Sequence, residues 1–237
     1  MTNTARLVPV LTSHAGSCLT LNNWQQAGIT LGALYLDALL MKPGLDFLKS
    51  QGNLKSYYPW SGELVLNAST LHENKAGLYR VRSQYDGEII EMDAPAIIAL
   101  MLALKPDYIV LSQSLKNQCQ FLQPEWQGIR LLSVEEGSYH YQNRLADFLA
   151  DKSKAGLIEA DFPAEDAMQG RIYDQGQAIN LLDNQYSQDF TALSTGCTCP
   201  VCPQGYTRAY FHHLLQHTPL LAQRFLIQHN VHYCQNH

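Results

Sequence analysis

The chain has 237 residues, of which 46% are hydrophobic and 16% charged, and it carries a formal net charge of −5. This composition can bury a core, and it excludes global disorder and collagen-like or coiled-coil classes. The acidic balance confines any nucleic-acid contact to a local basic patch. The sequence contains neither a long apolar span nor a basic segment followed by an apolar run. We therefore expect a cytoplasmic protein without a membrane helix.

Residues 1–113 alternate between strand and helix patterns. We expect strands at 6–11, 28–32, 62–67 and 107–111, helices at 20–24, 35–41, 45–50 and 94–104, and a hairpin pairing 79–83 with 87–91. Thr20 or Asn22 is suited to cap the first of these helices and Asp93 the last, and the Asp86-Gly87 step is typical of a hairpin turn. The β/α rhythm predicts a parallel sheet or a barrel.

Residues 114–169 are less regular. The pattern predicts a strand at 128–133, a helix at 141–152 and an acidic, turn-rich linker at 160–167. Helical spacing returns at 206–230, with a break expected at Thr218-Pro219. The domain boundaries that we predict are 1–113, 114–169 and 170–237.

Three of the six cysteines, Cys197, Cys199 and Cys202, lie within six residues. In a reducing compartment such a cluster favours metal binding over disulfides, and thiolates suit zinc. A tetrahedral structural site requires a fourth ligand. The candidates are His212, His213, His217, His229, His232 and Cys234. We favour His229, because it lies at the far end of the helical stretch, where the chain can fold back. We expect the other cysteines, Cys18, Cys119 and Cys234, to be plain thiols that are buried at least in part.

The C-terminal third resembles the end of tRNA-guanine transglycosylases, which exchange a guanine base in tRNA. The matching residues include Gly170-Arg-Ile-Tyr, Ala178-Ile-Asn180, the three cysteines, Arg208-Ala-Tyr-Phe-His-His-Leu-Leu215 and His229-Asn230. The resemblance implies a structural Zn²⁺ held by the three cysteines and His229. It extends more weakly to residues 7–113, through Lys42-Pro-Gly-Leu45 and Tyr79-Arg-Val-Arg-Ser83 among others.

Two departures from the family pattern bear on activity. The position that matches the catalytic Asp holds Asn67, and the position that matches the guanine-binding Asp holds Gln113. An amide cannot ionise, so it serves neither as a nucleophile nor as a general base. The segment 114–169 is also too short for the family's central region. A full (β/α)₈ barrel needs about 250 residues. We therefore expect a shortened or incomplete TIM-type barrel of the α/β class, with a C-terminal zinc-binding subdomain.

The favoured function is a non-catalytic, zinc-stabilised subunit that binds tRNA or supports assembly in queuosine-type tRNA modification. It would form a homodimer, or a heterodimer with a full-length transglycosylase, and Arg208 and His212 are candidate RNA contacts. Whether the protein is an enzyme stays open. The first alternative is an active transglycosylase-type enzyme with relocated residues, or with a different nucleic-acid or deazapurine substrate. The carboxylates available for this role are Asp147, Asp151, Glu159, Asp161, Glu165 and Asp166. The second alternative is a zinc-stabilised protein-interaction module.

Overall fold

The computed structural model describes residues 5–118, 125–126, 128–151 and 156–236, and the chain divides into two compact units. Unit 1 comprises residues 1–9, 13–29 and 140–237, and unit 2 comprises residues 10–12 and 30–139. Parallel strands and helices occur together, so the chain is of the mixed α/β kind that the sequence predicts. Among the described residues, no helix has the length and apolar character needed to cross a bilayer.

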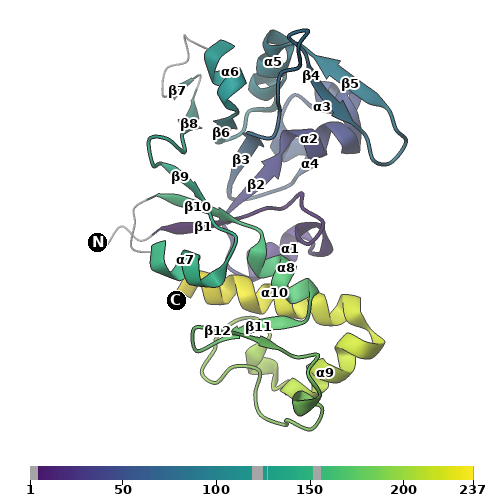
Figure 1. Cartoon of the computed structure of the whole chain (residues 1–237), viewed down its shortest axis with the longest axis vertical. Helices are drawn as coiled ribbons and strands as arrows, with labels where there is room; N and C mark the ends of the chain where they lie inside the picture. Colours follow the sequence, from purple (N-terminus) through teal and green to yellow (C-terminus); the bar gives the residue numbers. More distant parts are fainter. Residues whose placement is uncertain (1–4, 119–124, 127, 152–155, 237) are drawn as a thin grey trace. The chain divides into compact units, whose positions relative to one another are not determined.

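A five-stranded sheet with the order β2-β3-β6-β8-β7 forms the framework of unit 2 (Figure 1). Its strands are β2 (Leu31–Tyr35), β3 (Glu63–Ala68), β6 (Tyr108–Leu111), β8 (Ile129–Leu132) and β7 (Glu125–Trp126). The first four run parallel to one another, and β7 pairs antiparallel to β8. All four residues of β6 and most of β3 are buried, as expected for parallel strands that are covered on both faces.

Short helices and a hairpin complete unit 2. The helices are α2 (Leu36–Leu39), a π-helical turn η2 (Leu40–Gly44), α3 (Leu45–Gln51), α4 (Leu54–Tyr57), α5 (Ala94–Leu104) and α6 (Gln113–Gln118). The hairpin joins β4 (Tyr79–Arg82) to β5 (Ile89–Met92) around Asp86-Gly87, as the sequence predicts. Asp93 caps α5 by accepting a hydrogen bond from the Ala96 amide, and Lys105 ends the helix in the left-handed conformation. A cap and an apolar interior therefore fix the bounds of α5 at the predicted residues.

Two predicted elements of unit 2 need correction. The strand expected at 28–32 is β2, which begins at Leu31, because Gly28 has a φ of +85° and the Ile29 amide donates to the Trp24 carbonyl, closing the preceding helix. The helix expected at 35–41 is split into α2 and η2, with extended backbone at Lys42. The apolar pattern locates both elements, and local backbone geometry sets where they begin and end.

Two small sheets belong to unit 1. The first has the order β1-β10-β9, formed by β1 (Arg6–Pro9), β10 (Leu157–Ala160) and β9 (Tyr139–Tyr141), the last of which starts at the boundary with unit 2. The second is the antiparallel pair β11 (Arg171–Asp174) and β12 (Gln177–Asn180). The helices are η1 (Gly16–Cys18), α1 (Leu21–Gln26), α7 (Leu145–Asp151), α8 (Phe162–Met168), η3 (Asn184–Tyr186), η4 (Cys202–Gln204), α9 (Arg208–His217) and α10 (Pro219–Asn236). β1 and β10 run parallel, so the loops that follow them lie at the same edge of their sheet.

The linker predicted at 160–167 is wrong. This segment is the end of β10 followed by α8, in which Phe162, Pro163 and Ala167 are buried. Pro163 lies in the first turn, where a missing amide hydrogen costs no helical bond. The acidic residues Glu165 and Asp166 lie on the less buried side of the helix. The segment resembles a linker in composition because a short helix with one buried and one exposed side mixes apolar and acidic residues.

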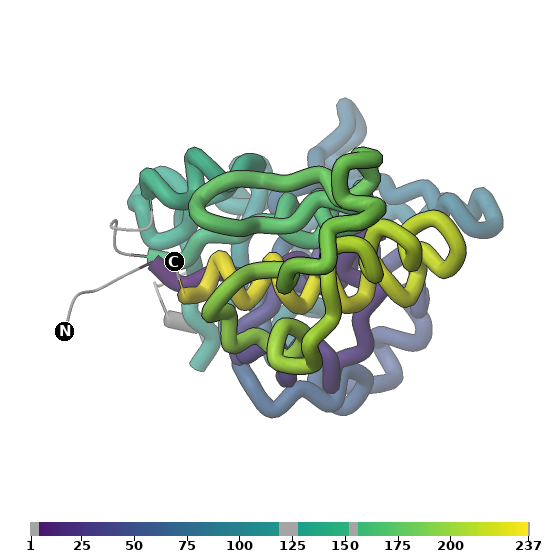
Figure 2. The backbone as a smooth tube through the Cα atoms, turned by 90° about the horizontal axis from the view of Figure 1, so that it is seen from below, coloured from purple at the N-terminus to yellow at the C-terminus, as the bar shows by residue number. Residues whose placement is uncertain are grey.

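The C-terminal helices are broken at Thr218-Pro219, as predicted. Thr207 caps α9 by accepting a hydrogen bond from the Tyr210 amide at 3.1 Å. The long helix α10 packs against α8, α9, β11 and β1 within unit 1. Figure 2 shows this helix in yellow, running beside the green segment that precedes it in the chain. α10 is therefore the element that carries His229 and His232 along the core of unit 1.

Among the described residues, the parallel strands of unit 1 belong to one sheet and those of unit 2 to another. A shortened TIM-type barrel therefore stays a prediction, whereas the α/β class and the Cys₃His group of the C-terminal region are present.

Candidate metal centre

The three clustered cysteines lie on a tight loop between β12 and α9. Backbone amides in this loop point at the sulfur atoms: Cys199 N lies 3.5 Å from Cys197 Sγ, and Cys202 N lies 3.3 Å from Cys199 Sγ. The Val201 amide also donates to Cys199 Sγ at 3.4 Å. Such donors favour a thiolate, because they stabilise negative charge on sulfur. The loop is therefore arranged to present thiolates to a cation.

His229 reaches the cysteine loop from the middle of α10. Its Nδ1 lies 3.7 Å from Cys197 Sγ, 3.6 Å from Cys199 Sγ and 3.4 Å from Cys202 Sγ. A tetrahedral zinc with Zn–S bonds of about 2.3 Å and a Zn–N bond of about 2.0 Å would set these atoms about 3.5 Å apart. The four ligand atoms all lie within 4.8 Å of one another. The geometry fits a tetrahedral Cys₃His site.

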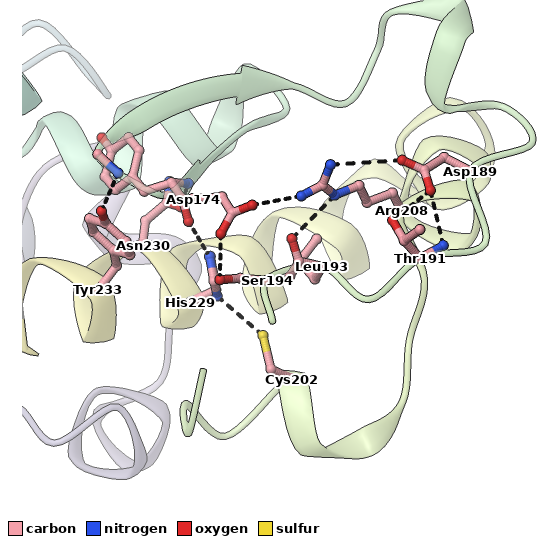
Figure 3. Close-up of polar contacts among 12 residues, drawn as sticks. Asp174, Asp189, Thr191, Leu193, Ser194, Cys202, Arg208, His229, Asn230 and Tyr233 are labelled. Carbon is pink, nitrogen blue, oxygen red and sulfur yellow. Dashed lines mark hydrogen bonds and ion pairs between the residues drawn. The ribbon is translucent and has the colours of Figure 1, made fainter. Parts of the chain in front are cut away.

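The other ring nitrogen of His229 orients the imidazole. Nε2 lies 2.8 Å from the Tyr173 carbonyl oxygen in β11, so it donates its proton there and leaves Nδ1 free to bind a metal (Figure 3). The adjacent Asn230 accepts a hydrogen bond from the Tyr173 amide and donates to the carbonyls of Pro163 and Arg171. Both His229 and Asn230 are fully buried. The His-Asn pair thus joins α10 to β11 and α8 while aiming one nitrogen at the cysteines.

Proton sharing within the cluster shifts its pKa values. Hydrogen bonds from the thiols of Cys199 and Cys202 lower the pKa of Cys197. The contacts with Cys197 and Cys199 raise the pKa of Cys202. Burial lowers the pKa of His229, but its contacts with Cys197 and Cys199 outweigh burial and raise that pKa to about 9. A divalent cation would replace these shared protons, because thiolate and neutral imidazole are the forms that bind metal.

The remaining C-terminal candidates lie outside this group of ligand atoms. His232 Nε2 lies 3.3 Å from Thr198 Oγ1, and Cys234 is buried. His213 and His217 are exposed and stack on each other with ring centroids 4.1 Å apart. Among the other cysteines, Cys18 is half-buried with its sulfur 3.5 Å from Met168 Sδ, whereas Cys119 lies outside the described residues. His229 is thus the ligand that both the sequence and the geometry favour.

The two candidate RNA contacts have partners inside unit 1. The Arg208 guanidinium donates to Asp174 Oδ2 at 2.7 Å and lies 3.8 Å from Asp189 Oδ2 (Figure 3). His212 is 5% exposed, with Nδ1 2.8 Å from the Leu181 carbonyl oxygen and Nε2 beside the Gln216 amide. RNA contact by these residues stays a prediction, and the geometry gives both of them structural roles.

Asn67 lies in β3, close to its carboxyl end, and Gln113 follows β6, the neighbouring parallel strand of unit 2. Asn67 is fully buried, and its Oδ1 accepts a hydrogen bond from the Ser69 amide at 2.9 Å. Gln113 begins α6, is exposed, and donates from Nε2 to Asn117 Oδ1. The buried amide supports a turn, and the exposed one pairs with its own helix. Neither arrangement supplies an ionisable group.

The six candidate carboxylates of residues 147–166 are not equivalent. Asp147 is exposed, Asp151 accepts from Gln142 Nε2, and Asp166 pairs with Arg171. Asp161, in contrast, directly follows β10 and accepts a hydrogen bond from Ser13 Oγ at 2.7 Å. Ser13 lies in the loop after β1, so both residues stand at the carboxyl edge of a parallel pair.

Burial raises the pKa of Asp161 to about 6, with smaller contributions from the charges of Glu165 and Glu159. Glu159 itself is 3% exposed. The carboxyl ends of parallel strands are where α/β proteins usually place reactive groups. The sequence does not predict that Asp161 lies at the end of a strand, because the surrounding residues have the composition of a linker. The apolar run 157–160 before it is the signal that indicates a strand end.

Unit 1 is thus an α/β unit whose C-terminal region carries a Cys₃His group with the geometry to hold a metal ion. Residues 157–237 match the family model for queuine tRNA-ribosyltransferase. A queuine tRNA-ribosyltransferase of Lachnoclostridium phytofermentans is 38% identical over 77 residues, which is 32% of this chain and 20% of that protein. The queuine tRNA-ribosyltransferase of Lachnospira eligens is 37% identical over 77 residues, which is 32% of this chain and 20% of that protein. That of Dinoroseobacter shibae is 29% identical over 86 residues, which is 36% of this chain and 23% of that protein.

Residues 157–237 are therefore similar to the queuine tRNA-ribosyltransferase family, which is the family that the cysteine and His-Asn motifs indicate. The match spans about a fifth of the length of these curated relatives. It includes β10, α8, the cysteine loop and α10, so every residue of the metal centre lies within it.

Proposed function

We propose that the Cys₃His group binds one structural Zn²⁺ through Cys197, Cys199, Cys202 and His229. The observation that carries this proposal is the agreement of the three sulfur-to-nitrogen distances with tetrahedral zinc. With four protein ligands no position is left for a reactive water, so the ion would cross-link the cysteine loop to α10. Zinc analysis by mass spectrometry under native conditions tests this. One tightly held zinc per chain supports the proposal. A folded chain that binds no zinc, even when zinc is added, contradicts it.

The protein acts as a non-catalytic subunit of the transglycosylase type, linked to queuosine-type tRNA modification. The supporting observation is Asn67, which stands where the resemblance expects a catalytic carboxylate. Its buried amide is occupied by a turn hydrogen bond and cannot ionise. Gln113, at the position expected to bind guanine, is exposed and donates to the side-chain amide oxygen of Asn117 in its own helix. Retained packing without a carboxylate favours a structural or binding role over base exchange.

Assembly is favoured over direct tRNA binding as that role. Arg171 and Arg208 of the metal subdomain are paired with carboxylates, so few cations there are free for phosphate. The corner between α9 and α10 instead exposes apolar surface: Tyr210 is 39% exposed and stacks on Tyr206, and Leu220 is 74% exposed. Exposed aromatic and aliphatic side chains are typical of protein interfaces. The partner is a second copy of the chain or a full-length transglycosylase.

Two measurements test the subunit role. The purified chain should not exchange labelled guanine into tRNA, alone or with added zinc. Sedimentation of the chain with and without a full-length transglycosylase should show a complex that Tyr210→Ala and Leu220→Asp weaken. Measurable base exchange that is lost in Asn67→Ala would contradict the non-catalytic role. A strictly monomeric chain that ignores the transglycosylase would contradict the assembly role.

Asp161 favours a second candidate, an enzyme of the transglycosylase type with relocated residues. Its carboxyl group ionises near pH 6, is held by Ser13 and lies at the carboxyl end of β10. A carboxylate in such a setting can act as a nucleophile or as a base. The same exchange assay distinguishes the two candidates. Turnover that is abolished in Asp161→Asn and retained in Asp147→Asn, an exposed control on α7, would establish the enzyme.

A further inference from the structure

A groove in unit 2 is separate from the metal centre and from Asn67. It has a volume of about 400 Å³ and is lined by residues 43–47, at the turn into α3, and by residues 88–91, along β5. A site of this size is at the lower end of those that hold small ligands or short peptide segments. The groove therefore places an edge of the β4–β5 hairpin opposite the start of a helix.

The backbone on this side of β5 is arranged as a strand edge. The Ser83 amide donates to the Glu88 carbonyl at 2.8 Å, so Glu88 and, two residues on, Ile90 direct their backbone groups toward β4. Alternation turns the N–H and C=O groups of Ile89 and Glu91 the other way. Within the described part of the chain, β5 belongs to a two-stranded sheet whose other member is β4. An open edge of this kind is a template for an added strand.

The charged residues that line the groove are all acidic. Asp46, Glu88 and Glu91 are exposed carboxylates, and the lining residues include no Lys or Arg. Arg80, across the hairpin, lies 3.7 Å from Glu91 and offsets only that charge. Apolar side chains lie between the acids: Phe47 is 40% exposed and Ile89 is 44% exposed. The wall thus offers alternating acidic and apolar contacts.

We propose that this groove binds an extended, basic peptide segment of a protein partner by strand addition to β5. Backbone hydrogen bonds would form with Ile89 and Glu91, apolar side chains of the peptide would cover Phe47 and Ile89, and Lys or Arg would face Asp46 and Glu88. With a rise of about 3.3 Å per residue, the four residues of β5 accommodate about four residues of such a segment. The acidic rim excludes RNA phosphate as the occupant.

Fluorescence anisotropy with a short labelled peptide that alternates lysine and valine tests the proposal. Saturable binding by the full chain is expected, and a glutamate–valine peptide should not bind. A lysine–valine peptide with N-methyl groups on alternate amides cannot donate to the strand edge, and it should bind about tenfold more weakly. Equal binding of the methylated peptide would overturn strand addition, and absence of saturable binding would overturn the site.

Matched charge reversals locate the site. Asp46→Lys and Glu88→Lys should each weaken binding about tenfold, because they place like charges against the peptide. Glu136→Lys changes the net charge equally at an exposed position of unit 2 outside the groove, and it should leave binding unchanged. Circular dichroism checks that each variant is folded. An equal loss in Glu136→Lys would show unspecific attraction to an acidic protein and would overturn the proposal.

Discussion

Asn230→Ala tests how the metal centre is held in place. The wild-type side chain is fully buried and makes three hydrogen bonds, with the Tyr173 amide at 3.1 Å and with the Pro163 and Arg171 carbonyls at 3.0 Å each. The substitution removes all three and leaves one amide and two carbonyls without this partner. At about 1 kcal/mol or more for each group, the free energy of unfolding of unit 1 should fall by about 3–5 kcal/mol. Whole domains are stable by only about 5–15 kcal/mol.

Amide hydrogen exchange of the β11 segment measures this loss within unit 1 alone. Under conditions in which exchange follows the opening equilibrium, a loss of about 3 kcal/mol accelerates exchange by about a hundredfold. Asn236→Ala is the matched control, since Asn236 is exposed on the same helix and donates to the His232 carbonyl one turn earlier. Its exchange rates should change by less than about threefold. Acceleration below tenfold in Asn230→Ala, or equal acceleration in the control, would refute the reasoning.

Three further changes probe separate features. Cys199→Ser should reduce bound zinc from about one per chain to a small fraction. Acidification should release zinc from the wild type, because protons compete for the ligands. Metal analysis after dialysis measures both effects. Asp161 has a folded-state pKa raised from 3.8 to about 6, so its contribution to stability is greatest below pH 3.8 and is lost as the pH rises to 6. Chemical unfolding should therefore show a fall of up to about 3 kcal/mol over this range that is absent from Asp161→Asn, and identical pH profiles would contradict the assignment. Gly62→Ala should destabilise unit 2 by about 2 kcal/mol or more, because a Cβ there would lie 2.0 Å from the Thr30 carbonyl oxygen, and an unchanged thermal midpoint would show that the backbone yields easily.

The sequence locates the cysteines of the Cys₃His group because their signal is local. Three cysteines within six residues have few uses in a reducing compartment, and their spacing alone fixes one loop. The fourth ligand depends on long-range contacts, because six candidate residues follow the loop and the spacing does not choose among them. The structure brings His229 to the three sulfur atoms because Nε2 binds the Tyr173 carbonyl and Asn230 secures the same strand. These contacts span more than fifty residues, and periodicity does not reveal them.

Element types in the fold follow from the sequence more closely than boundaries do. Helix α5 matches its predicted bounds because Asp93 caps it and Lys105 ends it. Strand β2 is displaced because the Gly28 turn completes the previous helix, a contact between backbone atoms that side-chain patterns do not encode. The acidic, proline-containing composition of α8 does not predict a helix, and the burial of its apolar side in the structure identifies it as one. Tertiary packing decides such short segments more than intrinsic propensity does.

Under the proposed non-catalytic role, Asn67 keeps the turn at the end of β3 without supplying an ionisable group. The side chain is fully buried at the end of β3, and its Oδ1 accepts the Ser69 amide hydrogen, a role that aspartate and asparagine oxygens fill equally well. A carboxylate at this position would add a desolvation cost that only a functional charge partner offsets, whereas the amide keeps the turn without that cost. The metal centre lies in unit 1 and Asn67 lies in unit 2, each with its own core. The energetic reasons for keeping the Cys₃His group and for keeping a carboxylate at position 67 are therefore independent, and the proposed role in assembly requires only the first.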